Sequence, residues 1–150
     1  MLYLLLDAGA DTYALATASV VAVVPYAALK TAPAAAPAVA GILNFRGQPV
    51  PVVDCGMLLA GCRCPLRFST RIILWRLELG GVERLLGLVG ENVTRVQAFE
   101  ECEFVEPGVR AADFPHAGRV AALGDRWVQR LHPEAVLTAE LWETLTTEAS

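Results

Sequence analysis

The chain has 150 residues, a length typical of a single domain. Hydrophobic residues make up 55% of it and charged residues only 19%, which excludes a disordered chain and indicates an unusually apolar surface or one that partners cover. The formal net charge of −4 argues against a nucleic-acid-binding protein, because neutralising phosphates requires clustered positive charge.

The first third of the chain has the pattern of short strands separated by turns. Strands are expected over residues 1–7, 12–16 and 19–24, with a turn at 9–11 and Pro25 ending the third strand. Two prolines within 31–40 leave room there only for a linker with one short helical turn. Two more apolar strands are expected over 41–45 and 49–53.

The uncharged run over residues 12–29 has about the length of a membrane-spanning helix. Its threonines, its serine and Pro25 disfavour such a helix, and its many valines favour a sheet. A signal peptide is not expected either, because no basic residue precedes the leucines at 4–6 and Asp7 interrupts the segment. These features predict a cytoplasmic protein that is not inserted in a membrane.

The second half continues the alternation of strands and turns. Residues 55–60 predict a brief helix that ends at Gly61, and residues 71–79 predict a strand before a Gly80-Gly81 hairpin turn. Strands are expected over 85–89 and 93–99, an acidic loop over 100–106, a hairpin over 119–131 and a short amphipathic helix over 139–145. Short strands with turns every 8 to 12 residues or so are typical of small barrels or of a sandwich, which makes the expected fold class mostly β.

The four cysteines are too few and too irregularly spaced for a disulfide framework. Cys62 and Cys64 are separated by one residue, whereas zinc-binding pairs usually have about two to four between them. No second cysteine or histidine pair follows at the spacing of a zinc site. We therefore expect free thiols and no metal.

Two stretches of the chain recur in its second half. Residues 14–23 match 87–96 at an offset of 73, and residues 48–53 match 126–131 at an offset of 78. A repeat of about 75 residues is too long for a solenoid unit and indicates two related small barrels. Each barrel would be marginal alone, so the two should share a core, and the cleft between them is a natural place for a partner.

The segment over residues 41–54, Gly-Ile-Leu-Asn-Phe-Arg-Gly-Gln-Pro-Val-Pro-Val-Val-Asp, resembles the signature of the CheW-like chemotaxis coupling proteins. Shorter stretches at 13–20, 70–73 and 127–129 also look like this family. The resemblance implies one domain over residues 1–150, built of two intertwined five-stranded SH3-like barrels with short helices, including one at the C-terminus. It also implies a non-catalytic adaptor without a cofactor.

The same resemblance implies two protein partners. One is the cytoplasmic tip of a methyl-accepting-type receptor, and the other is the regulatory domain of a CheA-like histidine kinase. Binding to the receptor would recruit the adaptor to the inner face of the membrane. The aromatic residue Phe45 looks more like the coupling proteins of surface-sensing clusters that control a diguanylate cyclase than like those of swimming chemotaxis.

Arg46 is the first candidate for a partner contact. It is the only charged residue between Lys30 and Asp54, and a guanidinium suits bidentate recognition of a carboxylate or of carbonyls. The resemblance associates this arginine with receptor coupling. The alternatives are an exposed turn arginine, or one that pairs with Asp54 to hold the turn.

Four further residues belong to the predicted partner-binding surface. Asn44 is expected to hydrogen-bond the turn backbone, and Gly47 to supply a positive φ. Val20 lies on the strand that faces the receptor in the family, with a core position as the alternative. Ala22 is expected on the same face as Val20, where the family usually carries an acidic residue.

Two other functions stay open. A small-molecule-binding barrel would hold an apolar ligand in the cleft between the two barrels. An enzyme would use His132 and Glu134 as an acid–base pair, although the chain has no glycine-rich phosphate loop and none of the common hydrolase motifs. His132 also stands where the family usually has aspartate.

Overall fold

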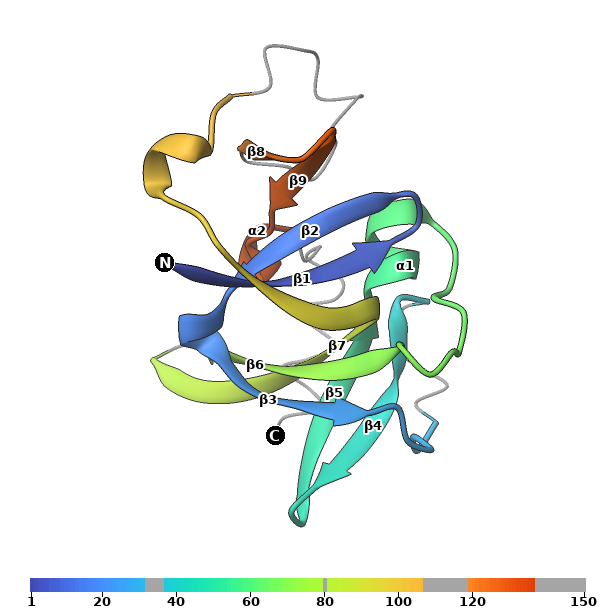
Figure 1. Cartoon of the computed structure of the whole chain (residues 1–150). Helices are drawn as coiled ribbons and strands as arrows, with labels where there is room; N and C mark the ends of the chain where they lie inside the picture. The colour runs from blue at the N-terminus through green and yellow to red at the C-terminus, as the bar shows by residue number, and fades with distance from the viewer. Residues whose placement is uncertain (32–36, 80, 107–118, 137–150) are drawn as a thin grey trace.

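The computed structural model describes residues 1–31, 37–79, 81–106 and 119–136, and these residues are mostly β-strand (Figure 1). The strands are β1 (Leu2–Ala8), β2 (Asp11–Ala16), β3 (Val20–Pro25), β4 (Val39–Phe45), β5 (Gln48–Asp54), β6 (Arg71–Leu79), β7 (Val82–Ala98), β8 (Val120–Leu123) and β9 (Arg126–Arg130). The helical segments are the 3-10 turns η1 (Thr17–Ser19) and η2 (Glu101–Glu103) and the helices α1 (Cys55–Ala60) and α2 (Pro133–Val136).

The strands form two five-stranded barrels that share β7. The order is β7-β1-β2-β9-β8 in barrel 1 and β3-β6-β7-β5-β4 in barrel 2. An isolated bridge between Val105 and Val120 joins the chain after β7 to β8, and one between Lys30 and Ile42 joins the chain after β3 to β4. These bridges bring the two ends of each strand order together, so the predicted pair of SH3-like barrels is confirmed.

The strand registers reproduce the repeat read from the sequence. Ala14 pairs with Arg130 in the parallel β2–β9 ladder, and Gly87 pairs with Val52 in the parallel β7–β5 ladder. Gly87 lies 73 residues after Ala14, and Arg130 lies 78 residues after Val52, which are the two offsets of the repeat. Each barrel contains strands from both halves of the chain, so the two barrels are intertwined.

One strand differs from the expectation. The sequence predicts two strands over 85–89 and 93–99, but β7 runs through both. Two of the three residues between them stay in the ladders: Gly90 pairs with Arg71 of β6, and Glu91 pairs with Asp7 of β1. Asn92 has a left-handed φ of 51°, and the register against β1 shifts just before Asp7. The strand therefore bends at this point and passes from barrel 2 into barrel 1 without ending.

The helices agree with the sequence in part. α1 begins at Cys55 and ends before Gly61, which has a left-handed φ of 76°, as predicted. α2 is not predicted by the sequence; it starts at Pro133, a residue that the first turn of a helix tolerates. The amphipathic helix expected over 139–145 lies outside the described residues.

The largest buried cluster joins the two barrels. Its members come from β1, β2, β5, β6 and β7 among other elements, and they include Leu4, Leu6, Tyr13, Leu15, Val53, Ile73, Trp75, Leu86 and Leu88. A smaller cluster around Tyr3 and Phe104 fills barrel 1, and another around Val50 and Ile72 fills barrel 2. Because buried side chains occupy the space between the barrels, an apolar ligand cleft at that place is not supported.

Glu101 in η2 and Arg130 at the end of β9 form an ion pair that responds to acid. Arg130 Nη1 donates to both carboxylate oxygens of Glu101, at 2.9 and 3.0 Å, and its guanidinium lies over the Phe104 ring. The hydrogen bond from Arg130 lowers the pKa of Glu101. The ion pair therefore stabilises the folded state fully above the ordinary glutamate pKa of about 4.3. This stabilisation is lost as the pH falls through the lowered pKa of Glu101.

We expect Glu101→Gln to flatten the acid limb of the plot of unfolding free energy against pH, because the amide carries no charge to titrate. Urea unfolding of both proteins at about pH 3 to 7 measures this change. Glu78→Gln, at an exposed position on β6, serves as the control and should leave the slope unchanged. Parallel acid limbs for the wild type and Glu101→Gln would contradict the prediction.

Candidate partner-binding surfaces

The tip of the β4–β5 hairpin is a two-residue turn. Phe45 pairs with Gln48, which leaves Arg46 and Gly47 as the central residues, with φ values of 53° and 81°. Two positive φ values define the type I′ turn, whose twist matches that of the flanking strands. A Cβ built on Gly47 would meet no other described atom within 4 Å, and Figure 1 shows the hairpin reaching away from the barrels.

Neighbouring side chains hold the turn and its arginine in place. Asn44 Oδ1 accepts a hydrogen bond from the Gly47 amide at 2.8 Å, and the Arg46 guanidinium lies 4.9 Å from the centre of the Phe45 ring. The predicted structural roles of Asn44 and Gly47 are therefore confirmed. Phe45, which packs half-buried against the barrel 2 cluster, acts as a platform for Arg46.

The proposed pairing of Arg46 with Asp54 is wrong. The turn and Asp54 lie at opposite ends of β5, and a strand of that length spans about 20 Å. Asp54 is instead buried, where its Oδ1 accepts from the amides of Met57 and Cys64, both at 3.2 Å, and so caps α1. Among the described residues, no ion pair involves Arg46.

Arg46 thus occupies a strained conformation, and no carboxylate among the described residues pairs with its charge. A left-handed backbone costs a residue other than glycine roughly 1 to 2 kcal/mol. Such strain collects at functional sites, where the surrounding structure holds a side chain in place for a contact. The side chain of Arg46 is exposed, and its five N–H donors form no hydrogen bond with a described residue, so they suit a partner's oxygens.

The two predicted residues of β3 lie on its inner face. Val20 packs half-buried against the cluster between the barrels, and Ala22 packs half-buried against the barrel 2 cluster. The exposed residues of the strand are Val21 and Val23, at 39% and 40%, and Pro25 at its end. The surface that β3 offers a partner is therefore made chiefly by Val21 and Val23, with Val20 and Ala22 beneath it.

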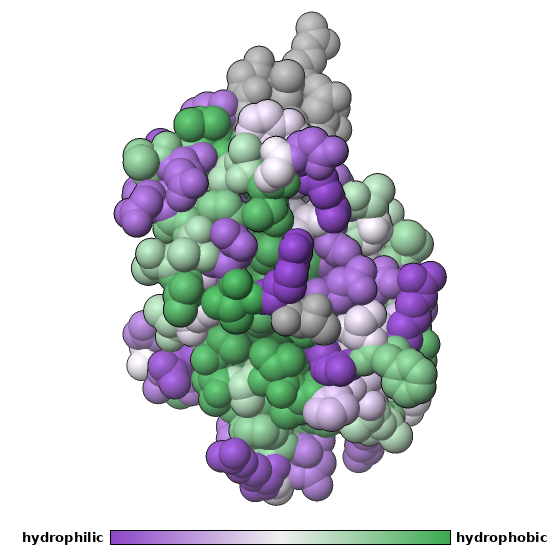
Figure 2. Space-filling view, viewed as in Figure 1, coloured by the Kyte–Doolittle hydropathy of each residue, from purple (hydrophilic) through white to green (hydrophobic). Residues whose placement is uncertain are grey.

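Exposed apolar side chains extend this surface beyond β3. Figure 2 shows hydrophobic residues gathered over β3 and the neighbouring parts of β1 and β7. Thr17 Oγ1 donates to the Leu2 carbonyl at 3.1 Å and so ties the start of β1 to the turn before β3. The exposed large apolar residues of β1, β3 and the C-terminal half of β7 are called the apolar face: Leu2, Val21, Val23 and Val96.

The sequence reasoning missed Leu2 and Val96. On β1, Leu2 lies on the same face as Leu4, which is only 7% exposed. On β7, Val96 pairs with that same Leu4, so both exposed residues lie on a face that is buried nearby. Leu2 and Val96 are exposed because of where the two barrels diverge. This position is known only from the pairing of the strands and not from the sequence. An exposed apolar patch is a candidate interaction surface, and the apolar face is one.

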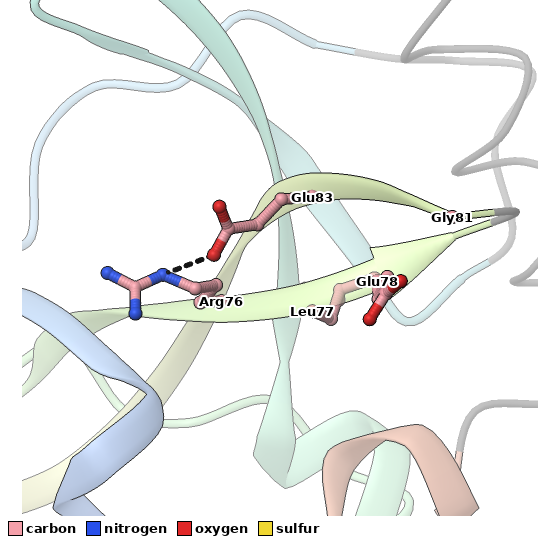
Figure 3. A pocket seen from close by; sticks show the side chains of 5 residues that line it. All are labelled: Arg76, Leu77, Glu78, Gly81 and Glu83. Carbon is pink, nitrogen blue, oxygen red and sulfur yellow. Dashed lines mark ion pairs between the residues drawn. The ribbon is translucent and has the colours of Figure 1, made fainter.

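The end of barrel 2 at the β6–β7 hairpin is charged. It carries a cavity of about 400 Å³ lined by Arg76, Leu77, Glu78, Gly81 and Glu83. Figure 3 shows the Arg76 and Glu83 side chains facing one another, and the Arg76 Nε to Glu83 Oε1 distance is 2.8 Å. The cavity is open and is lined by this ion pair and by the Glu78 carboxylate, which does not fit an apolar ligand.

His132 and Glu134, the two residues of the candidate acid–base pair, do not contact one another through a hydrogen bond. Glu134 Oε1 accepts a hydrogen bond from Trp75 Nε1 at 2.9 Å and so anchors α2 to β6. His132 is exposed and forms no hydrogen bond with Glu134.

In the described part of the chain, no three His, Cys, Asp or Glu side chains come together as metal ligands. No helix in that part is long and apolar enough to cross a membrane.

Comparisons with known proteins agree with this geometry. The model of the CheW-like domain family matches residues 2–141. No curated protein matches the chain in sequence. Among solved structures, the scaffolding protein TtCheW from Thermoanaerobacter tengcongensis is similar, with a TM-score of 0.78 and 20% identity over 93% of this chain and 89% of that one, which shows a shared fold. From the family match, the chain belongs to the CheW-like domain family.

Proposed function

We propose that this chain is a non-catalytic adaptor that couples a methyl-accepting-type receptor to a CheA-like histidine kinase in a bacterial signalling array. The observation that carries the proposal is the β4–β5 turn, which holds a strained, exposed arginine without an ion-pair partner in the described residues. Membership of the family supports a scaffold role. The adaptor works in the cytoplasm, at the inner face of the membrane to which the receptor recruits it.

The receptor tip is proposed to bind the turn and the apolar face together. Arg46 offers a planar fork of donors to a carboxylate or to backbone carbonyls, while Asn44 and Gly47 fix the turn. Val21 and Val23 offer apolar contact, and Val20 and Ala22 support them from within the barrels. A helical segment recognises such a surface through its own apolar side chains.

The kinase is proposed to bind at the end of one barrel. The regulatory domain of such a kinase resembles this chain in having the same double barrel, and in the family the two pair end to end. An interface of standard size buries about 1,600 Å² and is apolar at its centre. Titration calorimetry with the purified cognate regulatory domain is expected to give binding; no heat of binding at about 50 μM would contradict this part of the proposal.

We expect Val23→Glu to weaken receptor binding by about tenfold or more, which corresponds to about 1.4 kcal/mol. The new carboxylate would lose its water in an apolar contact, and such desolvation is unfavourable. Because Val23 is already 40% exposed, the substitution opens no core cavity, and the melting temperature should change little.

The measurement is the fluorescence anisotropy of a labelled receptor-tip fragment titrated with each protein. Val82→Glu is the matched control, because Val82 is a 51% exposed valine on β7 outside the apolar face. Equal losses in the two variants would show a general charge effect and would remove β3 from the receptor surface.

A further inference from the structure

The open end of barrel 1 forms a cavity of about 300 Å³ that the proposed adaptor role does not use. Its lining comes from four neighbouring strands of the barrel: Leu5, Asp7, Thr12, Asn92, Arg95 and Arg126. Leu5 belongs to the buried cluster of barrel 1, so the cavity has an apolar floor and a polar rim. The mouths of small barrels are common sites for small ligands, whose pockets begin at about this volume.

Asp7 is the centre of a hydrogen-bond network in this cavity. The Thr12 hydroxyl donates to Asp7 Oδ1 and the Asn92 amide donates to Asp7 Oδ2, both at 2.7 Å. Each carboxylate oxygen therefore has one neutral donor and keeps a lone pair for another. Arg126 Nη2 donates to Thr12 Oγ1 at 2.7 Å, so it reaches the carboxylate only through that hydroxyl.

Arg95 and Arg126 bring two positive charges to the rim, against the single carboxylate of Asp7. Both are exposed, and neither forms an ion pair with any other described residue, although the chain as a whole has an excess of acidic residues. Their unused guanidinium donors suit the oxygens of an anion. Asn92 adopts its left-handed φ of 51° beside them and brings its amide to the same cavity.

We propose that this cavity binds a small oxyanion that carries its own O–H donor, of which hydrogen phosphate is the simplest. Arg95 and Arg126 donate to the charged oxygens, and Asp7 accepts the hydrogen bond from the O–H group. Sulfate has the same shape but no O–H group at neutral pH, so it would turn an oxygen toward the Asp7 carboxylate and be repelled. The arginines thus provide affinity, and Asp7 provides selectivity.

Titration of the ¹⁵N-labelled full chain with sodium phosphate and with sodium sulfate, at equal ionic strength and pH 7, tests the proposal. We expect the amide signals around Asp7 and Asn92 to saturate with phosphate at a Kd at least about tenfold below that for sulfate. Arg95→Ala and Arg126→Ala should each weaken phosphate binding by about tenfold. Lys30→Ala removes one charge from an exposed residue of barrel 2 and should leave binding unchanged.

The Asp7→Asn variant tests the selectivity for phosphate over sulfate separately from the affinity that Arg95 and Arg126 provide. The preference for phosphate over sulfate should fall to near unity in this variant, and the ratio is measured within one protein, so a loss of stability does not affect it. Equal binding of phosphate and sulfate by the wild type would overturn the proposal, and so would an equal loss of binding in Lys30→Ala and Arg95→Ala. Either result leaves the adaptor role intact, since Arg46 and the apolar face do not line this cavity.

Discussion

Asp54→Ala is expected to lower the free energy of unfolding by about 2 to 4 kcal/mol. The Asp54 carboxylate accepts from the amides of Met57 and Cys64, and alanine leaves both without that acceptor. Loss of an N-cap costs about 1 kcal/mol, and a buried amide left unsatisfied costs about 1 to 3 kcal/mol. The Cys64 bond is fully buried, so water cannot replace the carboxylate there.

Urea unfolding at pH 7 measures the loss. Asp54→Asn is the matched control: it keeps an oxygen acceptor of the same shape and should lose clearly less stability than Asp54→Ala. If Asp54→Ala stayed within about 0.5 kcal/mol of the wild type, the capping role would be wrong. The segment over residues 41–54 therefore places an exposed arginine at one end of β5 and a buried carboxylate at the other.

Arg46→Ala is expected to weaken receptor binding by about thirtyfold, or 2 kcal/mol, while the melting temperature stays close to that of the wild type. The side chain is exposed and its one described contact is the face of the Phe45 ring, so truncation leaves no cavity. Alanine has the same left-handed strain as arginine at this position, which keeps the comparison of stabilities simple. Fluorescence anisotropy with the receptor-tip fragment and thermal unfolding by circular dichroism give the two values.

Arg46→Gly makes the result independent of backbone strain. Glycine adopts a φ of 53° without steric cost, so this variant should be as stable as the wild type or slightly more stable, yet bind as weakly as Arg46→Ala. A melting temperature lowered by many degrees in Arg46→Ala would make the arginine structural. Unchanged binding in both variants would make it an ordinary solvated arginine and would move the receptor site to β3 alone.

Features set by local chemistry could be predicted from the sequence. The β4–β5 turn follows from Asn44 and Gly47, since one side chain and one glycine suffice to fix a two-residue hairpin. The end of α1 at Gly61 follows from the same freedom of glycine. The repeat offsets could also be read directly, because the two parallel ladders use equivalent residues.

Features set by distant strands could not be predicted. The stretch over residues 20–24 is apolar throughout and has no alternation of apolar and polar residues, so the sequence cannot tell which of its side chains face outward. A register shift between Val20 and Ala22 adds to this ambiguity. The continuity of β7 likewise depends on distant strands, because β6 pairs with Gly90 and β1 pairs with Glu91. A glycine followed by a charged residue does not by itself suggest a continuous strand.

The coupling role is tested most directly by asking whether this chain brings the kinase to the receptor. Membranes that contain the cognate receptor are mixed with the kinase, with and without the chain, and the kinase that sediments with the membranes is measured. We predict that the kinase sediments only when the chain is present, in a saturable manner, and that Arg46→Ala strongly reduces the amount. Kinase that sediments equally without the chain, or that stays in solution when the wild-type chain is present, would contradict the coupling role.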